Sequence, residues 1–257
     1  MTRFTASDGV EIAFDDAGPR EGRPALLVHG FASNRYEGWK RTGWYAAFER
    51  RGQRVIAPDM RGHGESGKPH DPESYGRGRM AADLVELLDH LGVGSADVIG
   101  YSMGAGASLA LALNHPGRVA NLALGGVGAS MFEPPRAPGA MAFAMEAENP
   151  DDIPVPLLRS FRQFADEQGE DRLALAACVK APSERPGPDS LYALRMPVLI
   201  VAGARDQLAG DPQALADLIP GAHAVSLPGC DHFNAIPHGL LKAAVFDFLD
   251  GMLDFPH

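Results

Sequence analysis

Residues 96–114 read ADVIGYSMGAGASLALALN, a short apolar run followed by Gly100-Tyr101-Ser102-Met103-Gly104 and then by a longer apolar stretch with helical spacing. The run predicts a buried strand over 96–101, and the stretch predicts a helix over 103–114. Ser102 stands at the turn between them, in the pattern Gly-x-Ser-x-Gly. On such a tight turn the serine backbone is strained, and only small residues two places away let the neighbouring backbones approach. The alternative is that Ser102 merely caps the helix.

Short apolar runs bounded by Gly, Pro and Asp alternate with longer helical patterns on both sides of this stretch. Such alternation is typical of an α/β protein with a mostly parallel sheet flanked by helices. Strands are predicted over residues 4–5, 10–14, 25–28, 55–57, 96–101, 119–124, 198–202 and 224–227. Helices are predicted over residues 44–51, 80–91, 103–114, 213–218 and 240–249. The first two strands are expected to form an antiparallel hairpin with Asp8-Gly9 as a two-residue turn.

The alternation breaks between about residues 129 and 188, where prolines punctuate short helical stretches. These are Pro134, Pro135, Pro138, Pro150, Pro154, Pro156, Pro182, Pro186 and Pro188. Leu157, Phe161 and Phe164 fall on one helical face, and the charged residues Arg159, Arg162 and Asp166 fall off it. We therefore expect a helical cap over residues 129–188, inserted into a core domain formed by residues 1–128 and 189–257.

The composition describes a globular protein. The 257 residues are 45% hydrophobic and include only two cysteines, which excludes a disordered chain, a collagen and a disulfide scaffold. The 23 basic and 33 acidic side chains leave a net charge of −10. Because such a surface repels phosphate backbones and anionic lipid, no nucleic-acid partner is expected.

Neither a secretory signal peptide nor a membrane span is expected from the sequence. Residues 1–5 lack the apolar core of a signal peptide. The longest uncharged stretch, residues 98–114, approaches the length of a membrane span but is interrupted by glycines and polar residues. Cys178 and Cys230 are interpreted as free thiols of a reducing compartment. We therefore expect a cytoplasmic protein without membrane insertion, and the sequence leaves its oligomeric state open.

Residues 62–68 carry two nucleotide-binding patterns. Gly62-His63-Gly64-Glu65-Ser66-Gly67 spells the dinucleotide fingerprint, and its extension to Lys68 spells most of a P-loop. A P-loop needs Ser or Thr after the lysine, but Pro69 follows, and a dinucleotide site needs a helix directly after the glycines. We interpret the stretch as a glycine-rich turn. The histidines show no ligand spacing such as His-Glu-x-x-His, so neither a metal nor another cofactor is expected.

A serine hydroxyl becomes a nucleophile when a base takes its proton and a carboxylate orients that base. His232 follows the last predicted strand, and Asp206 follows the strand before it. Taken alone, each is more often an ordinary loop residue. Because the carboxyl ends of parallel strands meet at one edge of the sheet, their joint placement predicts a catalytic triad of Ser102, His232 and Asp206.

Three other residues compete for these roles. Asp211 precedes Pro212 and is expected to cap the following helix, although it is also a rival for the triad carboxylate. Asp231 adjoins His232, but the side chains of adjacent residues usually diverge. His29 lies between an apolar run and a glycine, and we interpret it as a structural histidine that shapes its loop.

The negative charge of a tetrahedral intermediate needs two fixed hydrogen-bond donors. One candidate is the backbone N–H of Met103, at the start of its helix. The other is the backbone N–H of Phe31, in the turn that follows the third strand. These two groups are the predicted oxyanion hole.

The predicted cap is rich in methionine and phenylalanine, side chains that line apolar substrate pockets but more often form core. The candidates for a pocket are Met131, Phe132, Met145, Leu157, Phe161 and Phe164.

Together these motifs resemble the α/β-hydrolase superfamily, specifically its small capped serine hydrolases of the esterase and lactonase type. His29-Gly30-Phe31 is similar to the oxyanion loop, residues 59–66 to the turn after the fourth strand, and residues 100–104 to the nucleophile elbow. Residues 203–206 and Asp231-His232 resemble the acid and base loops, and the order Ser, Asp, His matches the family. The resemblance implies an eight-stranded, mostly parallel sheet with a helical cap inserted after the sixth strand.

The function that we expect is that of a cofactor-free carboxylesterase acting on small-molecule esters with small to medium acyl groups. Ser102 attacks, His232 shuttles the proton, Asp206 orients His232, and water resolves the acyl-enzyme. A serine at the elbow excludes the branches that use an aspartate nucleophile. It leaves lactonase, thioesterase, carbon–carbon hydrolase and perhydrolase activities open, as well as a non-catalytic ligand receptor.

Overall fold

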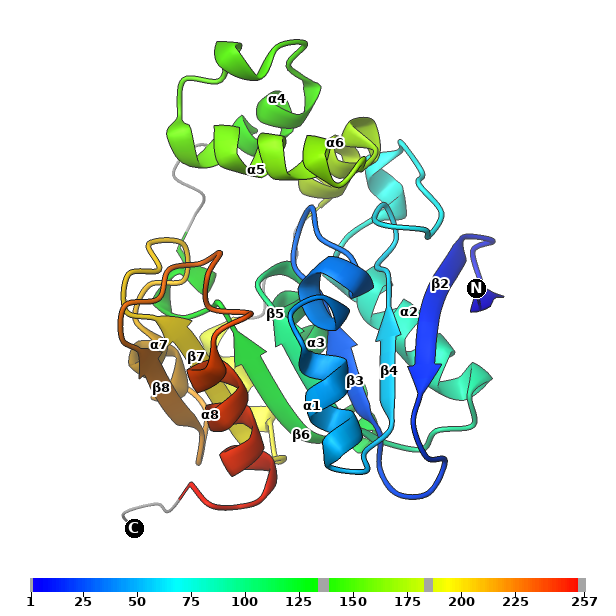
Figure 1. The fold of residues 1–257 in the computed structure, drawn as a ribbon, viewed down its shortest axis with the longest axis vertical. Helices are drawn as coiled ribbons and strands as arrows, with labels where there is room; N and C mark the ends of the chain where they lie inside the picture. Colours follow the sequence, from blue (N-terminus) through cyan, green and yellow to red (C-terminus); the bar gives the residue numbers. More distant parts are fainter. Residues whose placement is uncertain (1, 134–138, 183–186, 254–257) are drawn as a thin grey trace.

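In the described residues, eight strands form one sheet at the centre of the protein (Figure 1). The computed structural model describes residues 2–133, 139–182 and 187–253. The strands are β1 (Thr2–Thr5), β2 (Glu11–Ala17), β3 (Ala25–Val28), β4 (Val55–Pro58), β5 (Ala96–Tyr101), β6 (Val119–Gly125), β7 (Val198–Gly203) and β8 (His223–Leu227). Their order is β1-β2-β4-β3-β5-β6-β7-β8, with β1 and β2 antiparallel and the other six parallel to one another. The predicted eight-stranded, mostly parallel sheet is confirmed.

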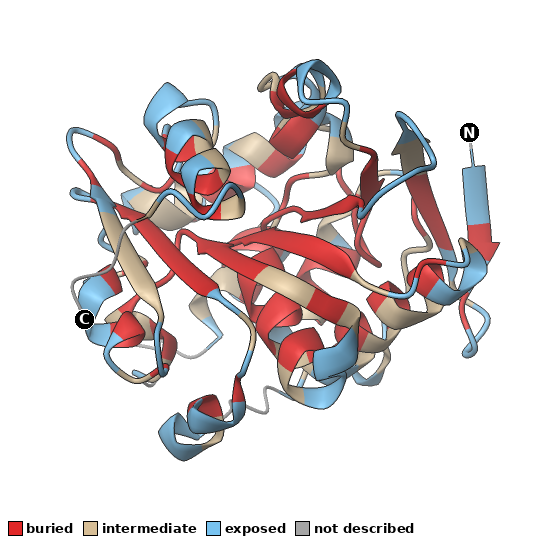
Figure 2. Ribbon diagram, turned by 90° about the horizontal axis from the view of Figure 1, so that it is seen from below, coloured by how far each residue is buried: buried red, intermediate tan, exposed pale blue. Residues whose placement is uncertain are grey.

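Helices cover both faces of this sheet. They are α1 (Trp44–Arg50), α2 (Arg77–His90), α3 (Met103–Asn114), α7 (Pro212–Ala216) and α8 (Gly239–Leu249). Side chains of α2, α3 and α7 pack with one face of the sheet, and side chains of α1 and α8 pack with the other. The strands are therefore mostly buried between two layers whose outer surfaces are exposed (Figure 2). Within the described residues, no helix combines the length and the apolar character needed to cross a membrane.

Three further helices form the cap in the part of it that the structure describes. They are α4 (Ala140–Glu146), α5 (Pro156–Glu167) and α6 (Arg172–Lys180), and they lie between β6 and β7 in the chain. Figure 1 shows them above the carboxyl ends of the parallel strands. The cap has an apolar cluster of its own, which Phe31 and Ala32 of the core also join. A cap after the sixth strand is confirmed, whereas its limits at residues 129 and 188 remain a prediction. Pro134, Pro135, Pro138 and Pro186 lie outside the described residues.

The turn between β1 and β2 is longer than predicted. Thr5 pairs with Glu11, so the loop spans residues 6–10 and is closed by a 2.8 Å hydrogen bond from the Ala6 N–H to the Val10 carbonyl. The two-residue turn was therefore wrong. The Gly9 N–H donates to the Ala6 carbonyl at 2.8 Å, and Gly9 has φ +87°, so Ser7 and Asp8 are the central residues of the turn and Gly9 follows them.

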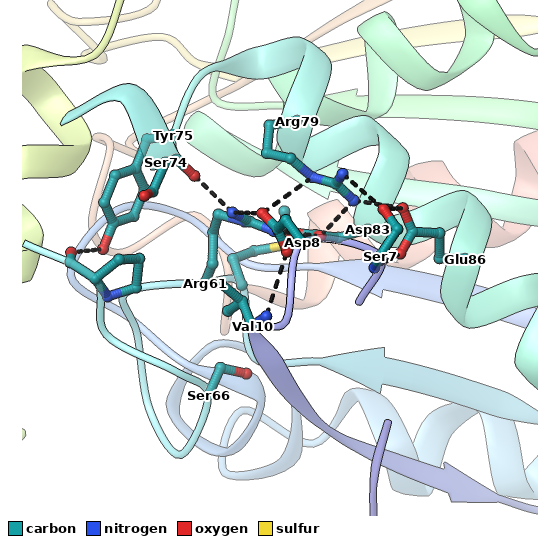
Figure 3. A network of polar contacts seen from close by, with 12 residues as sticks. Ser7, Asp8, Val10, Arg61, Ser66, Ser74, Tyr75, Arg79, Asp83 and Glu86 are labelled. Atoms are coloured by element: carbon teal, nitrogen blue, oxygen red, sulfur yellow. Dashed lines mark hydrogen bonds and ion pairs between the residues drawn. The ribbon is translucent and has the colours of Figure 1, made fainter. Parts of the chain in front are cut away.

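Arg61 is the centre of a buried polar network that joins three segments (Figure 3). Its fully buried guanidinium binds both carboxylate oxygens of Asp83 on α2 at 2.7 Å, Asp8 of the hairpin loop, and the Ser74 carbonyl at 2.6 Å. Because a buried charge is tolerated only when it is paired and hydrogen-bonded, these contacts fix the loop after β4 against α2 and the hairpin.

Arg162 of α5 was expected on the polar side of its helix but is buried, with a side chain 3% exposed. Its guanidinium donates to the carbonyls of Ala144 and Ala147 at 3.0 and 2.5 Å and pairs with Asp166 at 2.9 Å. The last carbonyls of a helix lack hydrogen-bond donors within the helix. Arg162 supplies such donors to the carboxyl end of α4. Helical periodicity could not show this, because the partners belong to another helix.

Candidate active site

Ser102 lies at the turn from β5 to α3, with φ +54° and ψ −113°. A Cβ atom at Gly100 would lie 2.5 Å from the Gly104 carbonyl oxygen, and one at Gly104 would lie 2.2 Å from the Val28 carbonyl oxygen. Only glycine therefore fits at both places, as the spacing predicted. The Ser102 side chain makes no capping hydrogen bond to α3, so the alternative of a simple helix cap was wrong.

The structure brings Ser102, His232 and Asp206 together. Nε2 of His232 lies 2.9 Å from Oγ of Ser102, and Nδ1 of His232 lies 2.7 Å from a carboxylate oxygen of Asp206. The three residues follow β5, β8 and β7, whose carboxyl ends share one edge of the sheet. Because a carboxylate only accepts hydrogen bonds, Nδ1 carries the proton of the neutral imidazole and Nε2 can accept from the serine hydroxyl.

The Asp206 carboxylate is fully buried and firmly held. Its second oxygen accepts the backbone N–H groups of Leu208 and Ala209 at 3.0 and 2.9 Å. The His232 loop is held as well, because the Tyr101 hydroxyl donates to the His232 carbonyl at 2.7 Å. The orientation of the imidazole is thus set from both sides.

The two rival carboxylates have other partners. Asp211 caps α7 by accepting the Gln213 N–H at 2.9 Å, as expected from its place before Pro212. Asp231 accepts the N–H groups of Phe233 and Asn234 at 2.9 Å and so stabilises its own turn. Of the three candidates, Asp206 is the one that contacts His232.

The predicted oxyanion donors, Phe31 and Met103, line a cavity together with Ser102. Within the described residues, no hydrogen bond occupies the backbone N–H of either one. His29 shapes this loop: its Nε2 accepts the Met60 N–H at 2.9 Å, and its Nδ1 donates to the Gly30 carbonyl at 2.8 Å. Complete burial lowers the pKa of His29 to about 4, which keeps it neutral. The trans peptide after Gly30 points its carbonyl and the Phe31 N–H in opposite directions.

His63 supports the same loop, although the sequence was interpreted only as a glycine-rich turn there. Its buried ring packs edge-on against Phe31 and His29, with centroids 5.8 and 5.3 Å away. Burial lowers the pKa of His63 to about 3, so this ring is neutral too. The sequence held no direct sign of this role, because the turns after β3 and β4 lie side by side only through the order of the strands in the sheet.

Two cavities meet at Ser102, with volumes of about 470 and 240 Å³. Phe31, Ser102, Phe161 and His232 line both of them. The larger cavity is mainly apolar and includes the sulfur-bearing side chains of Met80, Met103, Met131, Met141 and Cys178. Besides Ser102 and His232, the smaller cavity is lined by aromatic and apolar side chains and by the polar residues Ser33, Glu37, Arg41 and Thr42.

Half of the predicted pocket residues line these cavities. Met131 lines the larger one, Phe164 the smaller one, and Phe161 both. Phe132, Met145 and Leu157 line neither. Met145 is fully buried in the apolar cluster of the cap, where Leu157 also packs, because α4 and α5 face one another. Phe132 packs against the core below.

Several lining residues were missed. Leu208 and Ala209 follow Asp206, and Phe233 follows His232, so they reach the cavities because they adjoin site residues. Cys178 comes from α6, and no local pattern marks it. The loop of residues 62–68 precedes the single turn η2 (Pro72–Ser74) rather than a long helix, as expected. No group of His, Cys, Asp or Glu side chains suited to hold a metal ion occurs in the part of the chain that the structure describes.

Comparisons with known proteins identify the family of this chain. The family model described as alpha/beta hydrolase fold matches residues 24–167. The chain is 31% identical to the 2-hydroxymuconate semialdehyde hydrolase of Pseudomonas putida, over 85% of this chain and 83% of that protein. It is 30% identical to the non-heme chloroperoxidase of Streptomyces lividans, over 94% of both chains. A solved structure of a thermophilic esterase from Thermogutta terrifontis has a TM-score of 0.78 and 29% identity, covering 99% of this chain and all of that one.

The matched region begins before β3 and ends at α5, so it contains the turn at Ser102 and the first helices of the cap. The relatives extend the similarity over most of the chain. The resemblance suggested by the motifs is thereby confirmed, and this chain belongs to the α/β-hydrolase family.

Proposed function

We propose that this hydrolase cleaves carboxylic esters of small to medium acyl groups through a covalent acyl-enzyme at Ser102. The observation that carries the proposal is the chain of contacts from Ser102 Oγ to His232 Nε2 at 2.9 Å and from His232 Nδ1 to Asp206 at 2.7 Å. A hydroxyl, a base and an orienting carboxylate in this order activate a serine for attack on a carbonyl carbon.

The reaction proceeds in two halves. As Ser102 Oγ bonds to the carbonyl carbon, its proton moves to His232 Nε2, and the negative oxygen is received by the N–H groups of Phe31 and Met103. The intermediate collapses by breaking the bond to the alcohol oxygen, which takes the proton from His232. Water then gives a proton to His232 and attacks the acyl-enzyme, which releases the acid and returns the proton to Ser102.

The cavities suggest how an ester is held. When the carbonyl carbon of the ester lies at Ser102, its acyl part and its alcohol part extend into the two cavities that meet there. The larger, mainly apolar cavity suits whichever part carries the longer hydrocarbon chain, because burial of each methylene is favourable by about 0.8 kcal/mol. Methionine side chains adapt their shape easily, so the cavity should accept hydrocarbon chains of different shapes.

A second candidate is carbon–carbon bond hydrolysis with the same residues. It is favoured by the similarity to a semialdehyde hydrolase over 85% of the chain. Perhydrolysis, in which peroxide replaces water, is suggested in the same way by the chloroperoxidase relative. Lactonase and thioesterase activity would use the same chemistry on other acyl compounds.

The proposed function is tested by turnover on a matched panel of aryl esters, lactones, thioesters and vinylogous 1,5-diketones, each with and without hydrogen peroxide. We expect the highest kcat/KM for the aryl esters. A serine-reactive fluorophosphonate should modify Ser102 alone, as read by peptide mass spectrometry. Faster cleavage of the diketones, or labelling elsewhere, would contradict ester hydrolysis at Ser102.

Phe161 should set the preferred length of the ester. Its side chain, 6% exposed, stands between the two cavities and packs against Phe31 and Phe233 with ring centroids 6.1 and 5.0 Å away. Phe161→Ala removes this partition, so longer or branched esters should gain relative to the parent, whereas the smallest acetyl ester should change little. Each methylene newly buried changes kcat/KM about fourfold.

The measurement is the profile of kcat/KM against acyl length, together with the melting temperature. Met145→Ala is the matched control, because Met145 is fully buried in the cap but lines neither cavity. Both variants should lose stability, by about 2 to 5 kcal/mol. Only Phe161→Ala should alter the length profile, and an unaltered profile in that variant would show that Phe161 is scaffold.

A further inference from the structure

A buried carboxylate connects the cap to the core away from Ser102. Glu170 lies in the turn between α5 and α6 and is 8% exposed. Its Oε1 accepts the side-chain Nδ2 of Asn34 at 3.1 Å, and its Oε2 accepts the backbone N–H of Gly64 at 2.8 Å. Both donors belong to the core, while the Glu170 N–H is bound within the cap to the Ala165 carbonyl at 3.0 Å. We call the set of Glu170, Asn34 and Gly64 the cap latch.

The cap latch reaches the loop that carries a predicted oxyanion donor. Asn34 is three residues after Phe31, and its Oδ1 accepts the N–H groups of Tyr36 and Glu37 at 3.1 and 2.9 Å. Its amide therefore has one orientation, with the oxygen toward the short helix η1 (Tyr36–Lys40) and the nitrogen toward Glu170. Displacement of Glu170 would remove the support that the cap gives to this end of the loop.

The loop needs such support because its backbone is strained. Ala32, between Phe31 and Asn34, has φ +58°, an uncommon conformation for a residue with a side chain. Such residues persist only where the surroundings hold them in place. Within the loop, the Ser33 N–H donates to the Gly30 carbonyl at a long 3.3 Å. The hydrogen bonds from Asn34 to Glu170 and from the Arg35 N–H to Asp59, at 3.1 and 2.7 Å, are shorter.

A second buried carboxylate grips the same two loops from the core. Asp59 accepts the backbone N–H groups of Arg35 and Glu65 at 2.7 and 2.8 Å. Asn34 and Gly64, the residues directly before these two, are the partners of Glu170. The loops are thus held by Asp59 of the core and by Glu170 of the cap. Burial raises the pKa of both carboxyl groups, and the hydrogen bonds oppose that shift.

We propose that Glu170 is a positioning residue for the ester hydrolysis proposed above: through Asn34 it makes the oxyanion geometry at Phe31 depend on the seating of the cap. Glu170 lines a separate polar cleft with Asn34 and Gly64, and neither cavity at Ser102 includes it. It acts through the loop and not on the substrate. The cap therefore controls the rate even for substrates too small to be recognised by it.

The first test is Glu170→Gln, assayed with phenyl acetate. The glutamine oxygen can accept from Gly64 or from Asn34 but not from both, so one pair of donors is left facing each other. Complete removal of an oxyanion donor costs about 10² to 10³ in kcat, so a displaced donor should cost about tenfold. We expect kcat to fall by about tenfold while KM changes less than twofold.

The second test is rescue by exchanging the two groups. Asn34→Asp alone places two carboxylates against each other and should also lower kcat. Asn34→Asp combined with Glu170→Gln keeps the total charge and restores every hydrogen bond, because the new carboxylate accepts from the glutamine amide and the glutamine oxygen accepts from Gly64. We expect the double variant to recover most of the parent kcat. Glu167→Gln, which alters an exposed carboxylate three residues earlier, is the matched control and should leave kcat unchanged.

Amide hydrogen exchange gives a readout that does not depend on turnover. The N–H groups of Ser33, Arg35 and Gly64 should exchange faster in Glu170→Gln and return to the parent rate in the double variant. If the parent cleaves no ester, the proposed function fails while exchange still tests the latch. Parent-like exchange in Glu170→Gln would overturn the latch. Faster exchange with an unchanged kcat, or loss of kcat without rescue, would overturn the positioning role.

Discussion

Replacement of Ser102 by alanine should lower ester turnover by about 10⁴-fold or more while the protein stays folded. The change removes one oxygen atom, and alanine carries the same Cβ at φ +54° as serine, so the strained turn is no worse. The cavities and the backbone donors at Phe31 and Met103 remain. Residual activity above the uncatalysed rate should come from those groups alone.

The measurement is kcat/KM for an aryl ester together with the melting temperature of each variant. Ser130→Ala is the matched control, since Ser130 also lines the larger cavity but does not contact His232. That variant should keep both its activity and its labelling by a fluorophosphonate, and Ser102→Ala should lose both. Undiminished turnover in a folded Ser102→Ala protein would exclude the acyl-enzyme mechanism.

The strands were predictable where a local run of hydrophobic residues in the sequence is buried along its whole length. Strands β3 and β5 begin and end at the predicted residues, since each is a fully buried run that is apolar except for Asp97. Strand β2 extends three residues beyond its predicted end at Phe14. Its continuation over Asp15 and Asp16 looks polar in sequence, but these side chains pair with Arg35 and Arg54. A polar run can thus remain a strand when its partners come from elsewhere in the chain.

The meeting of Ser102, Asp206 and His232 was predictable for a related reason. In a parallel sheet, residues just after different strands are brought to the same edge, so position relative to a strand end determines position in space. For the cap, position relative to a strand end does not determine position in space. Its helices pack by contacts such as Arg162 with the end of α4 and Glu170 with Asn34, which are 15 or more residues apart and leave no periodic pattern. Only half of the pocket residues predicted on the cap therefore line the cavities.

Replacement of Asp206 by asparagine should lower turnover by an amount on the order of 10⁴, because it reverses the tautomer of His232. The Asp206 oxygen that accepts from Leu208 and Ala209 must remain an oxygen, so asparagine has to direct its amide nitrogen toward His232. That nitrogen donates to Nδ1, which then cannot carry the proton. The proton moves to Nε2, where it faces Ser102 Oγ, and the imidazole can no longer act as a base.

Asp211→Asn makes the same chemical change on the neighbouring helix and is the matched control. Asparagine is as good a helix cap as aspartate, so the hydrogen bond from the Gln213 N–H is retained and turnover should stay within about twofold of the parent. The kcat of both variants on one aryl ester, measured beside their melting temperatures, separates the two carboxylates. A large loss in Asp211→Asn with little loss in Asp206→Asn would reverse the assignment. Loss of activity in Asp206→Asn with an unchanged melting temperature would identify Asp206 as the group that holds His232 ready to accept the serine proton.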